Sequence, residues 1–315
     1  MAVRLVVAVT DRDWFDHLRS MTGLEEVNFW APSGANFRAL EPGELFLFKL
    51  HSPDNFIVGG GVFRYATTLP CSLAWDSFGP ANGAATLHEM RARIAHYRRA
   101  DPASREDFMI GCRILLRPFF LPRSEWISVP ESWSMNIVTF KTYSTDNREG
   151  LDLWHRVEPH LRGEIGQVQA VVPPPGMQHP EQARYGSPTL IAPRLGQGTF
   201  RVLVTDMYNR RCAITGERTL PALEAAHIRP YAESGSHEPS NGLLLRRDIH
   251  SLFDSGYVTV TPDLRFEVSN RIREEFENGR HYYALQGKAL TVPEKADLRP
   301  DRAALEWHNS TRFRG

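Results

Sequence analysis

Residues 223–256 combine side-chain types that can move protons and bind metal ions. Residues 223–228 are short and apolar around His227, which is typical of a β-strand that ends with an imidazole. A loop rich in Ser, Gly, Glu and Pro follows, and Asn241 with the next glycine predicts a turn. The run LLLRRDIHSLFDSG then predicts a helix that ends near Gly256.

On that helix His250 and Asp254 are four residues apart, so they share a face. We therefore expect a strand, a loop and a helix to present His227, His250 and Asp254 to one point. Because the chain has 12 histidines, a loose spacing of this kind also arises by chance. From the spacing alone, these residues could equally well be ordinary polar residues of a loop and a helix instead of an active site.

Metal-assisted hydrolysis of a phosphodiester is the chemistry that needs such a set. A neutral imidazole, with an unperturbed pKa of about 6.5, can take a proton from water, which suits His227. A divalent cation held by an imidazole and a carboxylate can polarise the phosphate, which suits His250 and Asp254. The amide of Asn241 would tie the loop to the strand and hold the base in position.

Four segments, read in order, resemble the HNH nucleases of the ββα-metal type, in particular their restriction endonuclease branch. They are RCAITG, LEAAHIRPY, SNGLLLRRDIHSLFDSG and YVTVTPDLRFEV. The resemblance covers residues 198–290, with His227 at the first motif histidine and Asn241 and His250 at the interval that the family shows. It implies a divalent metal ion, Mg²⁺ or Mn²⁺ or another, and double-stranded DNA as the substrate.

The sequence departs from this family at two places. Many members carry a metal ligand just before the first histidine, where this chain has Ala226. The second ligand is therefore open: Asp254 is preferred because helical geometry brings it beside His250, and Glu224 is the alternative. Many members also hold a structural zinc with two CxxC pairs. This chain has no such pair, so we expect no structural zinc bound by four cysteines.

Composition indicates a protein of two domains. The length of 315 residues is enough for two domains of ordinary size. The 37 basic residues equal the 37 acidic ones, so any contact with nucleic acid must come from local patches. No segment approaches the roughly 20 apolar residues of a membrane span, and three scattered cysteines fit a reducing cytoplasm better than a disulfide framework.

The expected boundaries follow the proline- and glycine-rich stretch in the middle of the chain. We expect a first domain at 1–160, a linker at 161–197 and the nuclease domain at 198–315. The first domain has short apolar runs between turn residues, which indicates a β-rich fold with one inserted helix at residues 85–99. We expect His237, in the SGSHEPSNG loop, to be a solvated residue, with contact to the substrate as the alternative.

The segment VNFWAPSGANFRALEPGELFLFKLHSPDNFIVGGGVF resembles the opening of EVE and related PUA-like domains. The resemblance implies a β-barrel that could read a modified base flipped out of the duplex, and such a pocket needs flat apolar faces and a few polar groups. Any single aromatic residue is more often core than pocket. The candidate faces and base-edge groups are Trp30, Phe37, Trp75, Trp126, Asn36 and Asp76.

The sequence thus predicts an α+β protein: an N-terminal PUA-like β-barrel followed by a C-terminal ββα-metal HNH nuclease domain. The expected function is metal-dependent cleavage of DNA, with restriction of foreign DNA that carries modified bases such as modified cytosine. One alternative is a nuclease or nickase without modification dependence. The other is a nucleic-acid-binding protein that has lost activity, which is suggested by Ala226 at the position of a metal ligand in the family. Because a nuclease with one site cuts both strands only by pairing two sites, we expect a homodimer.

Overall fold

The computed structural model describes the chain except residues 1, 35, 102–103, 135 and 166–193. The chain divides into two compact units, Met1–Pro193 and Arg194–Gly315. Each unit has its own buried core, so each is described by itself.

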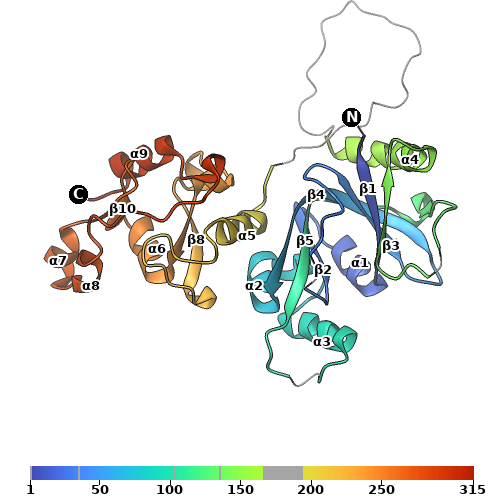
Figure 1. Ribbon diagram of the computed structural model, residues 1–315, viewed down its shortest axis with the longest axis horizontal. Coiled ribbons are helices and arrows are strands. Elements are labelled where there is room, and N and C mark those ends of the chain that lie inside the picture. The colour runs from blue at the N-terminus through green and yellow to red at the C-terminus, as the bar shows by residue number, and fades with distance from the viewer. Residues whose placement is uncertain (1, 35, 102–103, 135, 166–193) are drawn as a thin grey trace, which may run out of the picture. The chain divides into compact units, whose positions relative to one another are not determined.

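The first unit is built on a seven-stranded sheet (Figure 1). Its main path runs β2-β5-β4-β3-β1-β7, and β6 pairs with β4 off this path. Strands β1 and β3 are parallel and the other pairs are antiparallel. The strands are β1 Arg4–Thr10, β2 Glu26–Ala31, β3 Leu45–Leu50, β4 Phe56–Pro70, β5 Met109–Phe120, β6 Ile127–Ser128 and β7 Phe140–Ser144.

Both faces of this sheet are covered, which explains its continuous apolar strands. Alternate residues of β1 enter two different clusters because successive side chains of a strand point to opposite faces. Leu5 and Val7 pack in a cluster with Trp154 of helix α4 (Arg148–Ile165). Val6 and Ala8 pack in another, whose members include Trp14 and Phe15 of helix α1 (Arg12–Arg19). The sheet therefore forms the middle layer between α1 and α4.

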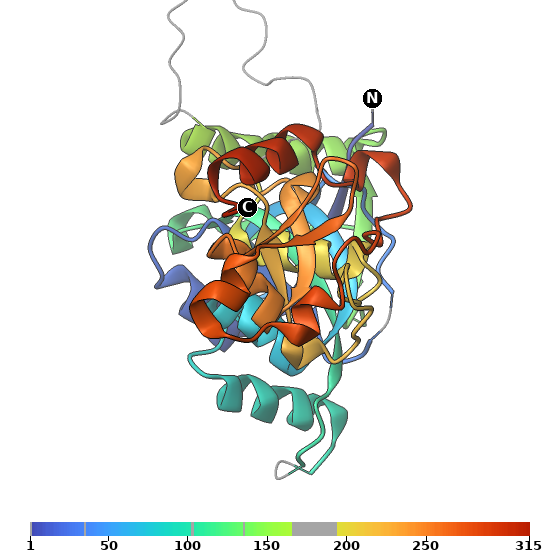
Figure 2. The ribbon, with the colours of Figure 1, turned by 90° about the vertical axis from the view of Figure 1, so that its left-hand side faces the viewer.

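Two further helices belong to the first unit, α2 (Cys71–Phe78) and α3 (Leu87–Arg98). The inserted helix expected at residues 85–99 is α3. It begins where the Thr86 hydroxyl accepts a hydrogen bond from the Glu89 amide, and it lies off one end of the sheet in both views (Figure 1, Figure 2). The sequence did not predict α1, α2 or α4.

The expected closed barrel was wrong for the strands that the structure describes, which form an open sheet. A barrel requires its first and last strands to pair, but β2 and β7 end the path unpaired with each other. After β7 the chain turns into α4, whose Leu153 and Val157 cover a sheet face. The sequence that could have supplied a closing strand is thereby used for a helix.

The linker was expected at 161–197, and its first residues are helical. Helix α4 continues to Ile165, and Leu161 is buried in the first unit's core. At the other end, helix α5 (Gln197–Met207) begins one residue before the expected start of the nuclease domain. Residues 166–193 of the expected linker lie outside the described residues.

The second unit contains a two-stranded ladder followed directly by a helix, the ββα arrangement. Its elements after α5 are β8 Leu223–His227, β9 Gly242–Arg246, α6 Arg247–Asp254, β10 Val258–Val260, β11 Phe266–Val268, α7 Arg271–Phe276, α8 Arg280–Tyr283 and α9 Arg302–Thr311. Strands β8 and β9 are antiparallel, with His227 opposite Gly242. The register therefore places the end of β8 beside the start of β9.

The helix predicted from LLLRRDIHSLFDSG was wrong in its first part, because residues 242–246 form β9. Leu243, Leu244 and Leu245 are all buried, since core residues cover both faces of the ladder. A run that is apolar at every position has no period of two, so it is equally compatible with a helix and with a strand. The expected helix begins at Arg247 and ends at Asp254, before Gly256 at φ 76°.

No helix in the described parts of the chain is both long enough and apolar enough to cross a bilayer.

Candidate active site

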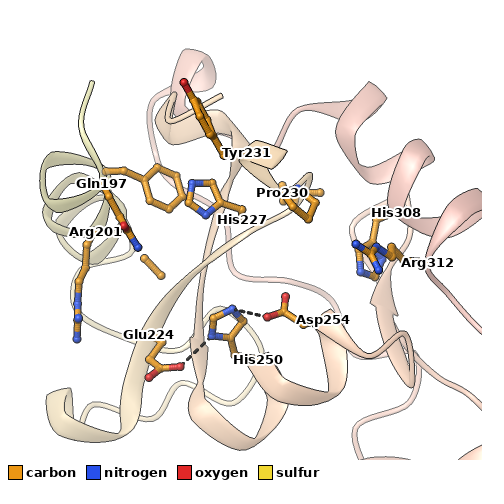
Figure 3. A pocket seen from close by; sticks show the side chains of 13 residues that line it. Gln197, Arg201, Glu224, His227, Pro230, Tyr231, His250, Asp254, His308 and Arg312 are labelled. Atoms are coloured by element: carbon orange, nitrogen blue, oxygen red, sulfur yellow. Dashed lines mark hydrogen bonds and ion pairs between the residues drawn. The ribbon is translucent and has the colours of Figure 1, made fainter. Parts of the chain in front are cut away.

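A cavity of about 540 Å³ opens in the second unit between α5, β8, α6 and the C-terminal helix (Figure 3). Polar and charged side chains from all four elements reach it. Its lining residues are Gln197, Phe200, Arg201, Glu224, Ala225, His227, Ile228, Pro230, Tyr231, His250, Asp254, His308 and Arg312. His227, His250 and Asp254, which the sequence predicted to converge, thus share one cavity with Glu224, the alternative metal ligand.

The His227 ring is held on two sides. Phe200 of α5 stacks on it with ring centroids 3.9 Å apart and an interplanar angle of 8°. Its Nε2 shares a hydrogen bond of 3.0 Å with Nδ1 of His237. Burial, helped by the nearby His237 and His250, lowers the pKa of His227 to about 4. The imidazole is therefore neutral at physiological pH, as a group that takes a proton from water must be.

His250 lies between two carboxylates. Its Nδ1 is 2.9 Å from Oε2 of Glu224 on β8, and its Nε2 is 3.3 Å from Oδ2 of Asp254 on the same helix (Figure 3). The other oxygen of Glu224 pairs with Arg247 Nε at 3.0 Å. Burial raises the pKa of Asp254 against the opposing effects of His250 and Arg312. Both candidates for the second metal ligand thus contact the same imidazole.

These donors fit a divalent metal ion by their chemistry. Imidazole and carboxylate are ligands that such ions accept in proteins. In its neutral form, the imidazole of His250 has a single N–H, so it would donate to only one of its two carboxylates and turn a lone pair toward the other. A cation would satisfy that second contact. Among the described residues, no three His, Cys, Asp or Glu side chains are already grouped around one metal position.

Asn241 does not line the cavity but fastens the loop that borders it. Its side-chain oxygen accepts a hydrogen bond from the Arg229 amide at 3.0 Å. Its amide group donates to the carbonyls of Arg229 and Ser236 at 2.9 and 2.8 Å. Asn241 is 5% exposed, and its own carbonyl accepts from the Ile228 amide. Removing this side chain would take away three hydrogen bonds, all of them partly buried, that hold the backbone of the loop.

Ala226, the departure from the family pattern, is fully buried in the core of the second unit. Its neighbours on the strand, Glu224 and His227, both reach the cavity. The carboxylate that could complete a metal site on β8 is therefore Glu224, two residues earlier than the family position.

Sequence reasoning missed several residues of this site. Phe200 was not among the expected site residues, and His237 was expected as a solvated loop residue. His237 instead bonds His227, and its ring stacks on Tyr231 with centroids 4.6 Å apart. The positive lining residues Arg201 and Arg312 come from α5 and the end of α9. These residues are distant in sequence or lie in a loop, so only the tertiary structure shows their proximity.

In the first unit, two of the six expected base-pocket residues lie together. Asn36 and Phe37 line a cavity of about 200 Å³, whose other lining residues are Arg38, Ala66, Thr67 and Cys112. The guanidinium of the buried Arg113 lies 5.3 Å from the Phe37 ring centroid. This cavity combines an aromatic face with polar groups.

The other four expected pocket residues do not line that cavity. Trp30 donates a hydrogen bond from Nε1 to the carbonyl of Asn82 at 2.9 Å. Trp126 donates to the carbonyl of Leu121 at 3.2 Å and packs against both sheet clusters. Trp75 is half-buried on α2, and the adjacent Asp76 is exposed. Their part in reading a base stays a prediction.

Comparisons with known proteins place the ββα segment in a family. The model of an HNH endonuclease family, HNH_2, matches residues 212–261, which contain β8, β9 and α6. No curated protein matches this chain.

Three solved structures are similar to this chain at low identity. Two are variants of the ZmASCH protein from Zymomonas mobilis, with 11% and 10% identity and a TM-score of 0.33 each, covering 47% of this chain and 92% and 94% of theirs. The third is the modification-dependent TagI restriction endonuclease, with 13% identity and a TM-score of 0.28, covering 98% of this chain and 81% of that one. The family match, together with the ββα geometry, confirms the expected nuclease domain. Residues 212–261 are an HNH endonuclease segment, and this chain is a nuclease.

Proposed function

We propose that this protein is a metal-dependent DNA endonuclease in which His227 is the general base. The observation that carries the proposal is a neutral, stacked imidazole in the same cavity as the Glu224, His250 and Asp254 cluster. One group can take a proton, and the other can hold a cation beside it. Metal-assisted hydrolysis of a phosphodiester uses both.

In the proposed reaction, His227 takes a proton from a water molecule as the water oxygen attacks phosphorus. A new P–O bond forms, and the P–O bond to the leaving sugar oxygen breaks. His250, with Asp254 or Glu224, would hold the divalent ion, which polarises the phosphate and neutralises charge on the leaving oxygen. Arg201 and Arg312 line the cavity together with the carboxylates of Glu224 and Asp254, so the bound divalent ion would supply the net positive charge for an anionic substrate.

Cleavage of supercoiled plasmid in the presence of Mg²⁺ or Mn²⁺ tests this function. We expect His227→Ala to lower the cleavage rate by about a hundred-fold or more, because general-base catalysis contributes on that scale. DNA binding should stay near normal. His281→Ala removes an exposed histidine away from the cavity and is the matched control. Equal rates for His227→Ala and the parent protein would remove His227 from the mechanism.

We further propose that the first unit directs cleavage to DNA with modified bases. The support is the cavity at Asn36 and Phe37, which offers an aromatic face and polar edges. Digestion of matched duplexes with cytosine, 5-methylcytosine, 5-hydroxymethylcytosine or glucosylated cytosine tests this proposal. Equal cutting of all four would leave a nuclease without modification dependence, and no cutting of any with added metal would indicate a DNA-binding protein without activity.

Assembly as a homodimer is part of the same proposal. One HNH site cuts one strand, so a double-strand break requires two copies of the site. Light scattering of the protein on duplex DNA should show two chains per cleaved site. A single chain per site, with nicked product only, would indicate a nickase.

A further inference from the structure

The loop between β8 and β9 places a second histidine against the proposed base. His237 Nδ1 lies 3.0 Å from His227 Nε2, and the two ring planes are inclined by 59°. His227 Nδ1 makes no hydrogen bond to any described residue, and it is not among the buried, unpartnered polar atoms. One ring nitrogen of the base is thus engaged by His237, and the other is left for a substrate or water.

This contact determines which nitrogen of His227 carries the proton. A neutral imidazole has one N–H and one lone pair. If Nε2 donates its proton to Nδ1 of His237, the lone pair of His227 lies on Nδ1, the nitrogen that is free to take a proton from water. Without a partner at Nε2, His227 would divide between two tautomers, and only one of them could act.

His237 is itself held in place by the surrounding loop. Its ring stacks on Tyr231 at an interplanar angle of 6°. The same loop is fastened by the Asn241 side chain, which accepts from and donates to the Arg229 backbone, and by an ion pair between Glu233 and Arg312. These contacts restrain the His237 ring, whereas the side chain of a solvated loop residue would have no such contacts. The loop therefore presents the Nδ1 atom of His237 at a fixed position.

We propose that His237 is a positioning residue for the nuclease reaction, which fixes the tautomer and the orientation of His227 through the Nε2–Nδ1 hydrogen bond. This inference rests on the proposed role of His227. It assigns a chemical function to a loop residue that lies outside the His227, Asn241 and His250 motif.

Two substitutions separate the polar contact from the ring contact. His237→Phe keeps a flat ring on Tyr231 but has no acceptor for His227 Nε2. His237→Asn loses the ring but keeps an oxygen that can accept near the position of Nδ1. We expect His237→Phe to lower kcat by about ten- to a hundred-fold, on the scale seen when an orienting partner is lost. KM should change little, and His237→Asn should recover most of kcat.

A structural role for the ring alone predicts the opposite order, with Phe active and Asn impaired, and that result would overturn the proposal. His227→Ala is assayed in parallel. If it cleaves normally, the proposed function fails; if it is inactive while His237→Phe cleaves normally, only the inference about His237 fails. The variant that combines His227→Ala with His237→Phe should cleave no more slowly than His227→Ala alone, because His237 is proposed to act only through the His227 imidazole.

Nitrogen NMR of the histidine rings gives a readout that does not depend on activity. The parent protein should show His227 as the single Nε2–H tautomer, and His237→Phe should show a mixture. A single Nε2–H tautomer in both proteins would contradict the proposal, even if the variant cleaved slowly for another reason.

Discussion

Glu224 and Asp254 contact opposite nitrogens of His250, so they can be distinguished by experiment. If the preferred ligand pair is correct, Asp254→Ala should raise the Mg²⁺ or Mn²⁺ concentration needed for half-maximal cleavage by about ten-fold or more, and Glu224→Ala should raise it less. Asp248→Ala is the control, since that carboxylate on the same helix pairs with Arg246 outside the cavity. The reverse order for Glu224 and Asp254 would assign the second ligand to Glu224.

The burial of His308 leads us to expect that the unfolding free energy depends on pH. It is 2% exposed, its Nε2 donates to the Phe253 carbonyl at 3.1 Å, and its Nδ1 accepts from the Thr259 hydroxyl at 2.8 Å. Burial lowers its pKa to about 4. The unfolded chain, with a pKa of about 6.5, binds a proton first as pH falls, so stability is full above pH 6.5 and is lost between 6.5 and 4.

Urea unfolding at pH 7 and at pH 4.5 measures this loss. The difference between the pKa values of His308 in the unfolded and the folded chain corresponds to about 3 kcal/mol of unfolding free energy for a fully buried group. His308→Gln, which does not titrate, should unfold with a smaller difference between the two pH values, and His281→Gln should behave like the parent protein. Identical pH dependence in the parent and His308→Gln would show that another group is responsible.

At the scale of the residue, the sequence located the proposed catalytic set but not its support. A strand end and a helical interval suggested that His227, His250 and Asp254 meet, and the resemblance to HNH nucleases distinguished them from a chance spacing. His237 was misjudged because a Ser- and Gly-rich loop gives no periodicity from which to place a side chain. Its partner Tyr231 is 59% exposed, which in sequence terms is indistinguishable from ordinary surface.

Among the elements, α5 packs closely against the start of β9 at Gly242. A Cβ added at Gly242 would lie 2.4 Å from Val204 Cγ2 and 3.0 Å from the Phe200 ring. We expect Gly242→Ala to destabilise the second unit by about 1–3 kcal/mol and to disturb the ring that stacks on His227. Thermal unfolding and plasmid cleavage would measure the two effects.

A second substitution provides the control for that prediction. Val204→Ala removes the methyl group that the new Cβ would strike, so Gly242→Ala with Val204→Ala should recover part of the lost cleavage. If Gly242→Ala were as stable and active as the parent protein, α5 would not be braced against β9 as described.

The elements also show where periodicity misleads. Strand β9 was read as part of a helix because Leu243 to Leu245 are buried on both faces. The β-rich character of the first unit was recognised because turn residues separate its short apolar runs. Helix α4, which directly follows β7, was missed because the sheet face that it covers includes residues of β1 at the other end of the unit's sequence.

For the whole molecule, we predict that residues 194–315 fold alone and nick DNA in the presence of a divalent metal, irrespective of base modification. That fragment contains the compact second unit and every lining residue of its cavity. A shorter fragment of residues 212–261 lacks Phe200 and Leu305, which are buried in the same core. It should neither fold nor cut, as circular dichroism and plasmid nicking would show.

The position of Phe200 has a consequence for how such nucleases can be recombined. The family signature starts at Cys212, yet the ring that supports the base comes from the helix before it, and Arg312 comes from the helix at the other end. A chimera joined at the edges of the signature would carry the motif histidines and leave out two walls of their cavity. The segment needed for catalysis in this chain is therefore longer than the segment that the family model matches. When nuclease domains are exchanged between relatives, the N-terminal junction should lie before Gln197.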